Sequence, residues 1–439
     1  MGATLVLHYR RTARFGLNVL LGAVEATPAT ARLAAIAAEG EGGVAAALQG
    51  APGPAVVAWS FFTASFPEVT AELARVRAAT PGLPVLHVAG GPHASGDPLA
   101  TLRAGFDLAA LGEGEETLPA LLASVARGEE PRAVPGLAWL EGGALRTSGR
   151  AAPVDLEAFP PCAPGARRIG PIEITRGCAW ACRFCQTPFL FRARFRHRSL
   201  EGVRRWVRFQ AEIAARDIRF LTPSALSWGS PGAGCDLDAI EALLAAAREA
   251  AGPERRLFFG SFPSELRPEH VSARALALLR RYCDNRTVVI GAQSGSERLL
   301  AELGRGHGVE EVRRAVALAV EAGLLPGVDL VFGMPGETEE DRVATRRLLR
   351  ELAAAGARVQ AHAFMPLPGT PWAAAPPGRV DPETAALLER LASAGHARGP
   401  WRRQEALARD AAGRRDPRAA AVPPATRPPG SGDDEAPPA

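Results

Sequence analysis

The segment Glu-Ile-Thr-Arg-Gly-Cys-Ala-Trp-Ala-Cys-Arg-Phe-Cys-Gln-Thr-Pro (173–188) decides how the rest of the chain is interpreted, because it places Cys178, Cys182 and Cys185 in a Cys-x3-Cys-x2-Cys spacing. Three thiolates can hold three irons of a [4Fe-4S] cluster and leave the fourth iron without a protein ligand. Clusters that only carry electrons are normally held by four cysteines. No fourth cysteine lies nearby, so the spacing predicts a cluster with an open iron.

The residues around the three thiols indicate a loop that wraps around a single bound group. An alternating run at 171–175 is typical of a short strand, and Gly177 permits a tight exit from it. Two other interpretations stay open. The three cysteines also share a helix face, so they could be core residues, although Trp180, Arg183 and Gln186 make a poor helical stripe. With His197 they could instead hold a structural zinc ion, which metal and sulfide analysis would distinguish.

Phe184, an aromatic residue directly before the last cysteine, completes a pattern that resembles the radical S-adenosylmethionine (SAM) superfamily. The resemblance implies that the three cysteines ligate the cluster and that the amino and carboxylate groups of SAM chelate the open iron. It also implies that Phe184 lies near the adenine. Cys162, Cys235 and Cys283 are scattered and are interpreted as ordinary core or loop thiols.

Length and composition indicate a globular protein of two or three domains, with 439 residues of which 47% are apolar. The first twenty residues lack the apolar run of a signal peptide, and no stretch approaches the ~20 apolar residues needed to span a bilayer. Six cysteines in so long a chain do not form a disulfide framework. We therefore expect a cytoplasmic protein with no membrane partner.

The basic residues exclude several kinds of chemistry. All 51 are arginines, which excludes a lysine Schiff base and a Walker-type phosphate loop. A net charge of +4 is too small to indicate a nucleic-acid partner. Four arginines and His197 gather in the segment 191–199, where guanidinium groups could bind an anionic substrate or cofactor, or simply form a solvated surface.

Residues 1–130 show short apolar runs separated by helical patterns, which predicts a Rossmann-like, doubly wound parallel sheet. The runs cover residues 4–8, 55–60, 85–89 and 107–111. Two glycine-rich turns follow the last two runs, where open parallel sheets bind their ligands. The residues singled out in these turns are Gly90, Gly91, His93, Gly112, Glu113 and Gly114.

Together with the cysteine motif, these turns resemble the cobalamin-binding domain that precedes the barrel in one branch of radical SAM enzymes. The resemblance implies a cobalamin near the two turns. The loop at 9–16 lacks the Asp-x-His-x-x-Gly element of classical cobalamin proteins, so we expect no lower histidine ligand from it. His93 is assigned to the neighbourhood of the corrin, and a capping or turn role is the alternative.

The rest of the chain divides by composition and pattern. Residues 131–170 are proline-rich and predict a linker with a small hairpin near 136–143. Strand and helix signals then alternate over 171–375, as in a partial (β/α) TIM-like barrel with catalytic groups at the carboxyl ends of its strands. Residues 376–415 predict a helical extension, and residues 416–439 predict a disordered, proline-rich tail.

Five strand ends after the cysteines occur in the order in which the family holds SAM. Each alone could be a strand-to-helix turn with a helix cap, but the order favours a SAM site. One departure is plain, because Thr222-Pro-Ser224 stands where the family places Gly-Gly-Glu. The cofactor-binding residues that the resemblance implies are Phe184, Thr222, Ser224, Glu265, Gln293, Ser294, Ser296 and Glu337.

The resemblance implies a cobalamin-dependent radical SAM enzyme. In such enzymes the reduced cluster cleaves SAM to a 5′-deoxyadenosyl radical, and methylation of an unactivated carbon is the expected outcome here. An oxidative cyclase or rearrangement enzyme without methyl transfer is one alternative, and a non-catalytic iron–sulfur electron carrier or sensor is another. A methylthiotransferase acting on RNA is disfavoured, because residues 1–161 contain no cysteine. We expect a small-molecule substrate and an electron donor such as flavodoxin or ferredoxin; neither the substrate's identity nor a catalytic residue follows from the sequence.

Overall fold

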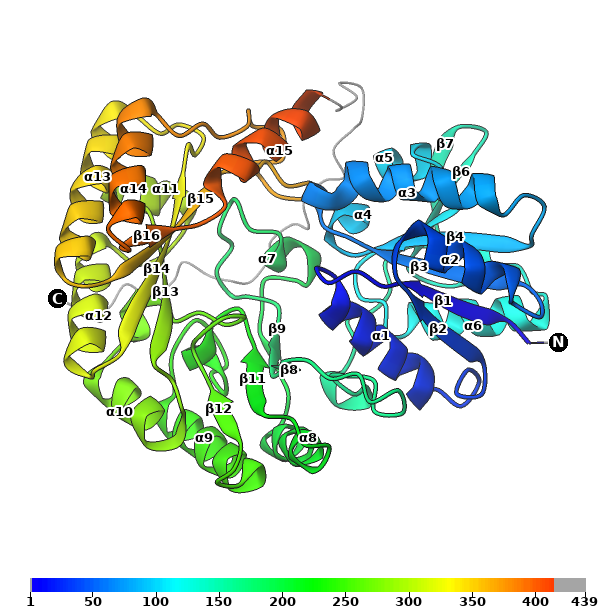
Figure 1. Cartoon of the computed structure of the whole chain (residues 1–439), viewed down its shortest axis with the longest axis horizontal. Helices are drawn as coiled ribbons and strands as arrows, with labels where there is room; N and C mark the ends of the chain where they lie inside the picture. The colour runs from blue at the N-terminus through cyan, green and yellow to red at the C-terminus, as the bar shows by residue number, and fades with distance from the viewer. Residues whose placement is uncertain (1, 414–439) are drawn as a thin grey trace.

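The computed structural model describes residues 2–413, and the tail predicted to be disordered, at 416–439, lies outside the described residues. Two α/β halves lie side by side (Figure 1). The amino-terminal half contains a seven-stranded sheet, and the carboxyl-terminal half contains two parallel sheets followed by helices. The predicted fold class is confirmed.

The amino-terminal sheet has the strand order β2-β1-β3-β4-β5-β6-β7, with the first five strands parallel. The order 2-1-3-4-5 is that of flavodoxin-like doubly wound folds, which bind ligands at the carboxyl ends of their strands. These ends point toward the other half of the molecule (Figure 1). The strands are β1 (Thr4–His8), β2 (Ala34–Ala38), β3 (Ala55–Ser60), β4 (Val85–Gly90) and β5 (Leu108–Ala110).

Helices cover both faces of this sheet because each presents one apolar stripe. Leucines of α1 and α6 pack on one face, whereas apolar residues of α2 and α3 pack on the other around Trp59. Such two-sided burial accounts for the continuous apolar runs of the parallel strands. The helices are α1 (Arg14–Ala26), α2 (Gly40–Gln49), η1 (Thr63–Ser65), α3 (Phe66–Ala79), α4 (Pro92–Gly96), α5 (Pro98–Arg103), α6 (Thr117–Arg127) and η2 (Pro131–Ala133).

The hairpin predicted near 136–143 forms and extends the sheet beyond residue 130. Strands β6 (Leu137–Glu141) and β7 (Ala144–Thr147) pair antiparallel, and β6 pairs antiparallel with β5. Gly142 and Gly143 both have positive φ angles, as a tight hairpin turn requires. The connector after β7 contains the short η3 (Leu156–Ala158).

The second half is a parallel, barrel-like arrangement in two sheets that a bridge between Leu266 and Ile290 links. One sheet has the order β12-β11-β8 and the other β13-β14-β15-β16. The strands are β8 (Ile172–Glu173), β11 (Asp217–Leu221), β12 (Arg256–Phe258), β13 (Thr287–Gln293), β14 (Leu325–Phe332), β15 (Arg358–Ala363) and β16 (Ala397–Arg398), while β9 (Thr175–Arg176) and β10 (Arg196–His197) form a separate antiparallel pair.

Helices enclose these strands, and one large apolar core fills the space between them. Along β14, side chains point alternately into this apolar core and into the cavity enclosed by the strands. Asp329 and Val331 face the cavity. The helices are α7 (Thr187–Leu190), α8 (Leu200–Glu212), η4 (Ala225–Ser227), α9 (Leu237–Ala251), η5 (Pro268–His270), α10 (Ala273–Tyr282), α11 (Glu297–Leu303), α12 (Val309–Glu321), α13 (Glu339–Ala354), α14 (Pro382–Ser393) and α15 (Trp401–Gly413).

The two halves meet near α4 and α7, among other places. The Gln186 amide donates to the carbonyl oxygens of Pro92, in the amino-terminal half, and Pro368, after β15, at 3.2 and 2.8 Å. A Cβ on Gly96 would lie 2.5 Å from the Pro368 oxygen, so α4 and the loop after β15 are in close contact. Helix α15 contacts both β15 and η1 (Figure 1). Among the described residues, no helix combines the length and apolar character needed to cross a membrane.

Candidate functional site

The three cysteines lie in a non-helical loop between β9 and α7, so the alternative of three core cysteines on one helix is not what forms. Gly177 has a φ of 80° and begins the loop directly after β9. A Cβ at this position would lie 2.1 Å from the Arg194 carbonyl oxygen. Only glycine therefore allows the strand that follows the loop to pass so close to its start.

We expect Gly177→Ala to abolish cluster loading although all three thiols remain. The substitution combines a positive φ, which costs an L-residue about 1–3 kcal/mol, with a backbone clash that must displace the loop. Iron and sulfide content after anaerobic reconstitution measures the effect. Gly232→Ala is the matched control, because it is also in a loop but has no heavy atom within 4 Å of its Cβ position. Normal iron content in the Gly177 variant would contradict this account.

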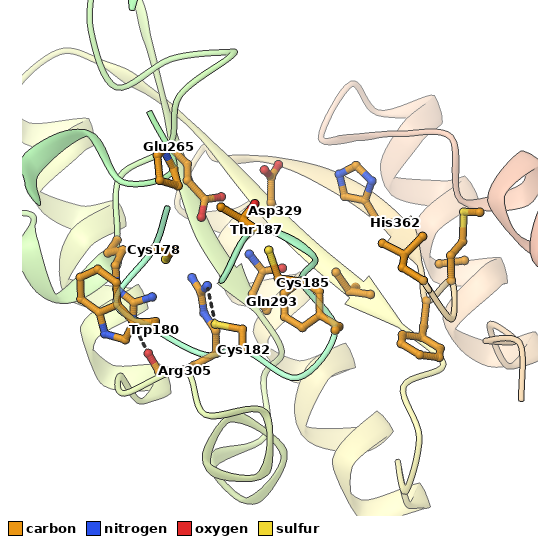
Figure 2. Close-up of a pocket in the computed structure, with 18 of the residues that line it drawn as sticks. Cys178, Trp180, Cys182, Cys185, Thr187, Glu265, Gln293, Arg305, Asp329 and His362 are labelled. Atoms are coloured by element: carbon orange, nitrogen blue, oxygen red, sulfur yellow. Dashed lines mark hydrogen bonds between the residues drawn. The ribbon is translucent and has the colours of Figure 1, made fainter. Parts of the chain in front are cut away.

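Cys178, Cys182 and Cys185 all line one cavity of about 360 Å³ (Figure 2). Burial raises the pKa of the Cys178 thiol to about 12 and also raises that of Cys185. Buried thiolates need cationic partners, and bound iron ions would supply them. Both ring nitrogens of His197 are engaged elsewhere, one with the Thr175 hydroxyl and one with the Ser230 carbonyl, each at 3.0 Å. This geometry disfavours a zinc site of three cysteines and His197, and three cysteines on one cavity fit the larger cluster.

Two buried arginines flank the cysteine loop. Arg305 donates from Nη1 to Cys182 Sγ at 3.7 Å and from Nη2 to the Gly291 carbonyl at 2.5 Å. Arg267 forms an ion pair with Glu269 at 2.5 Å, and its guanidinium lies 3.8 Å from the centre of the Trp180 ring. Two guanidinium groups thus lie at the cysteine end of the cavity.

Carboxylates line the next part of the cavity. Glu265 lies above the cysteines in Figure 2, and Asp329 lies between Glu265 and His362. Gly291 makes room for Glu265 and Arg305, because a Cβ there would lie 2.8 Å from Glu265 Oε2 and 3.0 Å from Arg305 Nη2. Burial raises the pKa of Glu265, and burial together with the charge of Glu265 raises the pKa of Asp329 to about 7. Acceptors for hydroxyl or ammonium groups thus lie beside the cysteines.

We expect the stability of the chain to reveal this Asp329 pKa. In the unfolded chain Asp329 ionises near its ordinary pKa of 3.8, whereas the folded residue keeps its proton up to about 7, so raising the pH across that range destabilises the fold. The slope is at most about 1.4 kcal/mol per pH unit. Asp329→Asn lacks it, so the variant should gain stability relative to the unsubstituted protein between pH 5 and 8. Urea unfolding of cluster-free protein measures this gain, and a difference that stays constant with pH would refute it.

Gln293 lines the cavity through an unusual backbone conformation. Its φ is 71°, and the pairing of β13 with β14 shifts register between Gly291 and Gln293. A non-glycine residue with positive φ at a strand end is strained, and such strain concentrates at binding sites. The bulge turns Gln293 toward the carboxylates (Figure 2).

His362, from β15, lies at the end of the cavity far from Cys178 (Figure 2). Gln404, from α15, also lines the cavity and contacts His362. Gln404 Oε1 accepts from the Ala363 amide at 2.9 Å, so its Nε2 must donate to His362 Nδ1, at 3.2 Å. Burial lowers the pKa of His362. The neutral ring therefore carries its proton on Nε2, which makes His362 a hydrogen-bond donor for a ligand.

Of the residues predicted to bind SAM, Phe184, Glu265 and Gln293 line the cavity. The others lie in the turns that support it. The Thr222 hydroxyl donates to the Ser224 carbonyl, and the Ser224 and Ser227 hydroxyls bond to each other, so Pro223 lines the cavity between them. Ser294, Ser296 and Glu337 make hydrogen bonds to Thr345, Asp341 and the Gly333 amide.

The two glycine turns of the amino-terminal half lie together. Ser95, in the helix after the first turn, accepts a hydrogen bond from the Gly112 amide at 2.9 Å. Gly91 and Gly112 have φ values of 88° and 85°. A Cβ added to Gly112 would have no heavy atom within 4 Å, so the space beside this residue is open. Backbone so exposed at the ends of β4 and β5 fits a large ligand that approaches closely. Gly90, at the end of β4, borders the same turn.

His93 lies away from this open surface. It is 4% exposed, its ring stacks on Phe66 with centroids 4.1 Å apart, and its Nδ1 contacts the Thr63 hydroxyl at 3.2 Å. The side chain packs inside the amino-terminal half. This placement matches the alternative of a structural residue in the turn.

Glu113 and Glu115 join a buried ion cluster with the cysteine loop. Arg176, two residues before Cys178, pairs with Glu113 at 2.8 Å and with Glu115 and Glu173 at 2.6 Å. Arg196 pairs with Glu113 as well. The second glycine turn is thereby attached to the loop that carries the thiols.

The remaining residue of the second glycine turn and the other arginines of the segment 191–199 have separate roles. Gly114 packs against α1, because a Cβ there would lie 2.8 Å from Leu20. Arg198 is buried and donates to the carbonyl oxygens of Glu173 and Phe159, whereas Arg192 and Arg194 are exposed. The segment 191–199 thus mixes structural and solvated arginines.

Sequence reasoning did not find Arg267, Arg305, Asp329, His362 or Gln404. Each is a single polar residue on a separate element, and the cavity brings them together only in three dimensions. The signal that could have found Asp329 is its place inside an otherwise apolar strand, Val-Asp-Leu-Val. The signal for Arg305 is a charge flanked by two glycines directly after a helix.

Comparisons with known proteins agree with this organisation. Residues 172–349 match the Radical SAM superfamily, and residues 9–122 match the B12 binding domain. A tRNA-2-methylthio-N(6)-dimethylallyladenosine synthase of Chlorobium phaeobacteroides is 36% identical over 186 residues, 41% of this chain and 40% of that protein. An uncharacterized protein of Methanopyrus kandleri is 27% identical, covering 66% of this chain and 62% of its own length. The chain thus spans about two fifths of the synthase's length.

Solved structures share the fold across both halves. TsrM from Kitasatospora setae, a radical S-adenosylmethionine methyltransferase with cobalamin and a [4Fe-4S] cluster bound, superposes with a TM-score of 0.67 at 19% identity, over 85% of this chain and 74% of its own. OxsB, a cobalamin-dependent S-adenosylmethionine radical enzyme with aqua-cobalamin bound, gives a TM-score of 0.62 at 14% identity, over 80% and 52%. At these identities the likeness establishes the common fold.

Proposed function

Because the chain is a radical SAM protein with an amino-terminal B12-binding domain, its cofactors being a [4Fe-4S] cluster, SAM and cobalamin, we propose that it methylates a carbon of a small molecule. The observation that carries the proposal is the single cavity on which the three cysteines, the two carboxylates and His362 all open. The end of the cavity at the cysteines suits a cluster and its SAM, and the end at His362 suits a substrate. TsrM, a methyltransferase by its name, shares this two-part fold.

Residues of this chain suit the two groups at the cysteine end. Cys178, Cys182 and Cys185 would ligate the cluster, and Phe184 would lie against the adenine of SAM. Glu265, Asp329 and Gln293 offer acceptors for the ammonium and hydroxyl groups of SAM, and Arg305 offers a donor for its carboxylate. Glu265, from the loop after β12, would then take the place of the missing Gly-Gly-Glu, while Thr222, Ser224, Ser294, Ser296 and Glu337 shape the turns around the cavity.

When bound, the cluster supplies the electron for SAM cleavage and the cobalamin carries the methyl group. The protein positions the bound groups, places charged side chains around them and excludes water from the site. Burial in the cavity removes water from around the carboxylates, which strengthens their interactions with cationic or hydroxylated ligands. The open backbone at Gly112, with Gly90 and Gly91 in the neighbouring turn, would face the corrin, and Glu113 and Gly114 hold the Gly112 turn in place through Arg176 and Leu20.

The substrate would lie at the end formed by β15 and α15. His362 Nε2–H is a neutral donor there, beside the apolar side chains of Phe364, Met365 and Leu367. A substrate with an apolar body and one hydrogen-bond acceptor suits these residues. An electron donor such as flavodoxin or ferredoxin, a cytoplasmic location and the lack of a nucleic-acid partner belong to the same proposal. The clustered cysteines, which need a reducing environment to bind iron, and the weak net charge support it.

The test is an anaerobic reaction of reconstituted protein with SAM labelled in its methyl group, supplied with cobalamin and candidate apolar small molecules. The proposal expects one labelled methyl group per product molecule. Substrate consumed without label would favour the cyclase or rearrangement alternative. Loaded, reduced protein that neither cleaves SAM nor transfers its methyl would favour an electron carrier or sensor. The absorption spectrum of the corrin bound to the purified protein tests the amino-terminal domain separately.

A further inference from the structure

Arg305 occupies a position that SAM binding alone does not explain. The residue is 4% exposed, and its Nη1 donates to the sulfur of Cys182 at 3.7 Å. Nη2 donates to the Gly291 carbonyl at 2.5 Å, and Nε donates to His307 Nε2 at 3.2 Å. The charge is therefore held in one place against a cysteine that the cluster would use.

His307 supports this orientation. Its Nδ1 lies 3.2 Å from the Gly308 carbonyl, so the ring proton sits on Nδ1 and Nε2 is free to accept from Arg305. Burial and the nearby charge of Arg305 lower the pKa of His307 to about 4, in keeping with a neutral ring. The arginine backbone is fixed too, because its carbonyl accepts a hydrogen bond from Arg267.

The two buried arginines differ in how their charges are balanced. Arg267 has a carboxylate partner, Glu269, at 2.5 Å. The Arg305 guanidinium instead donates to a carbonyl, a neutral imidazole and a thiol, with Glu265 across Gly291 as the nearby carboxylate. One guanidinium nitrogen of Arg305, Nη1, is thus directed at the cysteine loop without a carboxylate bonded to it.

From this geometry we propose that Arg305 raises the reduction potential of the cluster by a charge-assisted hydrogen bond to Cys182. A cluster becomes more negative when it accepts an electron, and a buried cation stabilises the more negative state. Hydrogen bonds to cluster sulfurs are an established determinant of potential. The inference rests on the proposed cluster and adds that Arg305 acts through Cys182 before SAM is present.

The experiment is a redox titration of reconstituted, SAM-free protein with sodium dithionite, in which the electron paramagnetic resonance signal reports the reduced cluster. In Arg305→Gln the ratio of reduced to oxidised cluster at a fixed solution potential should fall at least tenfold, a shift of about 59 mV for one electron. Arg305→Lys keeps the charge and should retain most of the potential of the unsubstituted protein. Arg183→Gln is the matched control, because Arg183 neighbours Cys182 in sequence but is exposed, and it should leave the potential unchanged.

An unchanged potential in Arg305→Gln, or an equal fall in the Lys variant, would overturn the inference and leave the proposed function standing. Failure of the unsubstituted protein to hold a cluster would overturn both. If the Gln variant alone holds no cluster, protein labelled with ¹⁵N-arginine provides the answer without it. The reduced cluster should then show hyperfine coupling to guanidinium nitrogen, which disappears in Arg305→Lys, and absence of coupling in the unsubstituted protein would refute the contact.

Discussion

Replacing Cys178, Cys182 or Cys185 singly with alanine is expected to reduce bound iron to background and to abolish SAM cleavage. Each sulfur lines the same cavity, so the loss of one leaves two ligands for an assembly that needs three. Iron and sulfide analysis with absorption spectroscopy after anaerobic reconstitution measures the first effect. The yield of 5′-deoxyadenosine or of demethylated SAM measures the second.

Cys235→Ala is the control for these three variants, because Cys235 is only partly buried and is absent from the cavity lining. It should bind iron as the unsubstituted protein does. Equal iron loss in this control would point to general unfolding, and a full cluster in any of the three single variants would disprove the ligand assignment.

Replacing Arg176 with methionine should cost about 3–5 kcal/mol of unfolding free energy. The side chain is similar in volume, but it leaves Glu113, Glu115 and Glu173 near one another with Arg196 and Arg198 as the remaining nearby cations. Burial acts to raise the pKa of Glu115, yet the charge of Arg176 and its hydrogen bond lower it below 4.5 overall. The stabilisation is therefore present at neutral pH and is lost as the pH falls through the folded pKa, so the deficit of the variant should shrink in acid.

Urea unfolding at pH 7 and at pH 4 measures both the size and the pH dependence of this effect. Arg146→Met, which removes an exposed pair with Glu141, should leave the unfolding midpoint unchanged. Adding Glu115→Gln to the Arg176 variant should restore part of the lost stability, because it removes one of the uncompensated charges. An Arg176 variant as stable as the unsubstituted protein would show that the cluster makes no net contribution.

The sequence predicted the parallel strands where apolar residues run without interruption. The runs at 4–8, 55–60 and 85–89 correspond to β1, β3 and β4, because strands buried on both faces must be apolar throughout. Strand β2 was not among those predicted. Its sequence, Ala-Ala-Ile-Ala-Ala, has little β-propensity, its side chains are largely exposed, and it forms because β1 offers an open edge.

The same contrast holds at the site. The cysteines could be predicted because a local spacing carries their chemistry, and Glu265 and Gln293 because they follow strands in an ordered series. Arg305 and Asp329 could not, because their significance depends on packing around Gly291, which only the folded chain brings about. Polar residues that cap helices and residues that bind ligands also look alike in sequence, as Ser294 and Ser296 illustrate.

The contact of Gln186 with Pro92 and Pro368 has an evolutionary consequence. Both acceptors are main-chain oxygens, so the joint between the two halves does not depend on which side chains those positions carry. Point mutations at Pro92 and Pro368 can accumulate while this contact persists, whereas Gly96, which packs against Pro368, and Arg176, which pairs with Glu113 and Glu115, cannot be replaced so freely. A chimera that exchanges one half for that of a distant homologue should keep the contact between the halves if it retains the backbone path, a glycine at position 96, a glutamine after the last cysteine and the carboxylates that pair with Arg176.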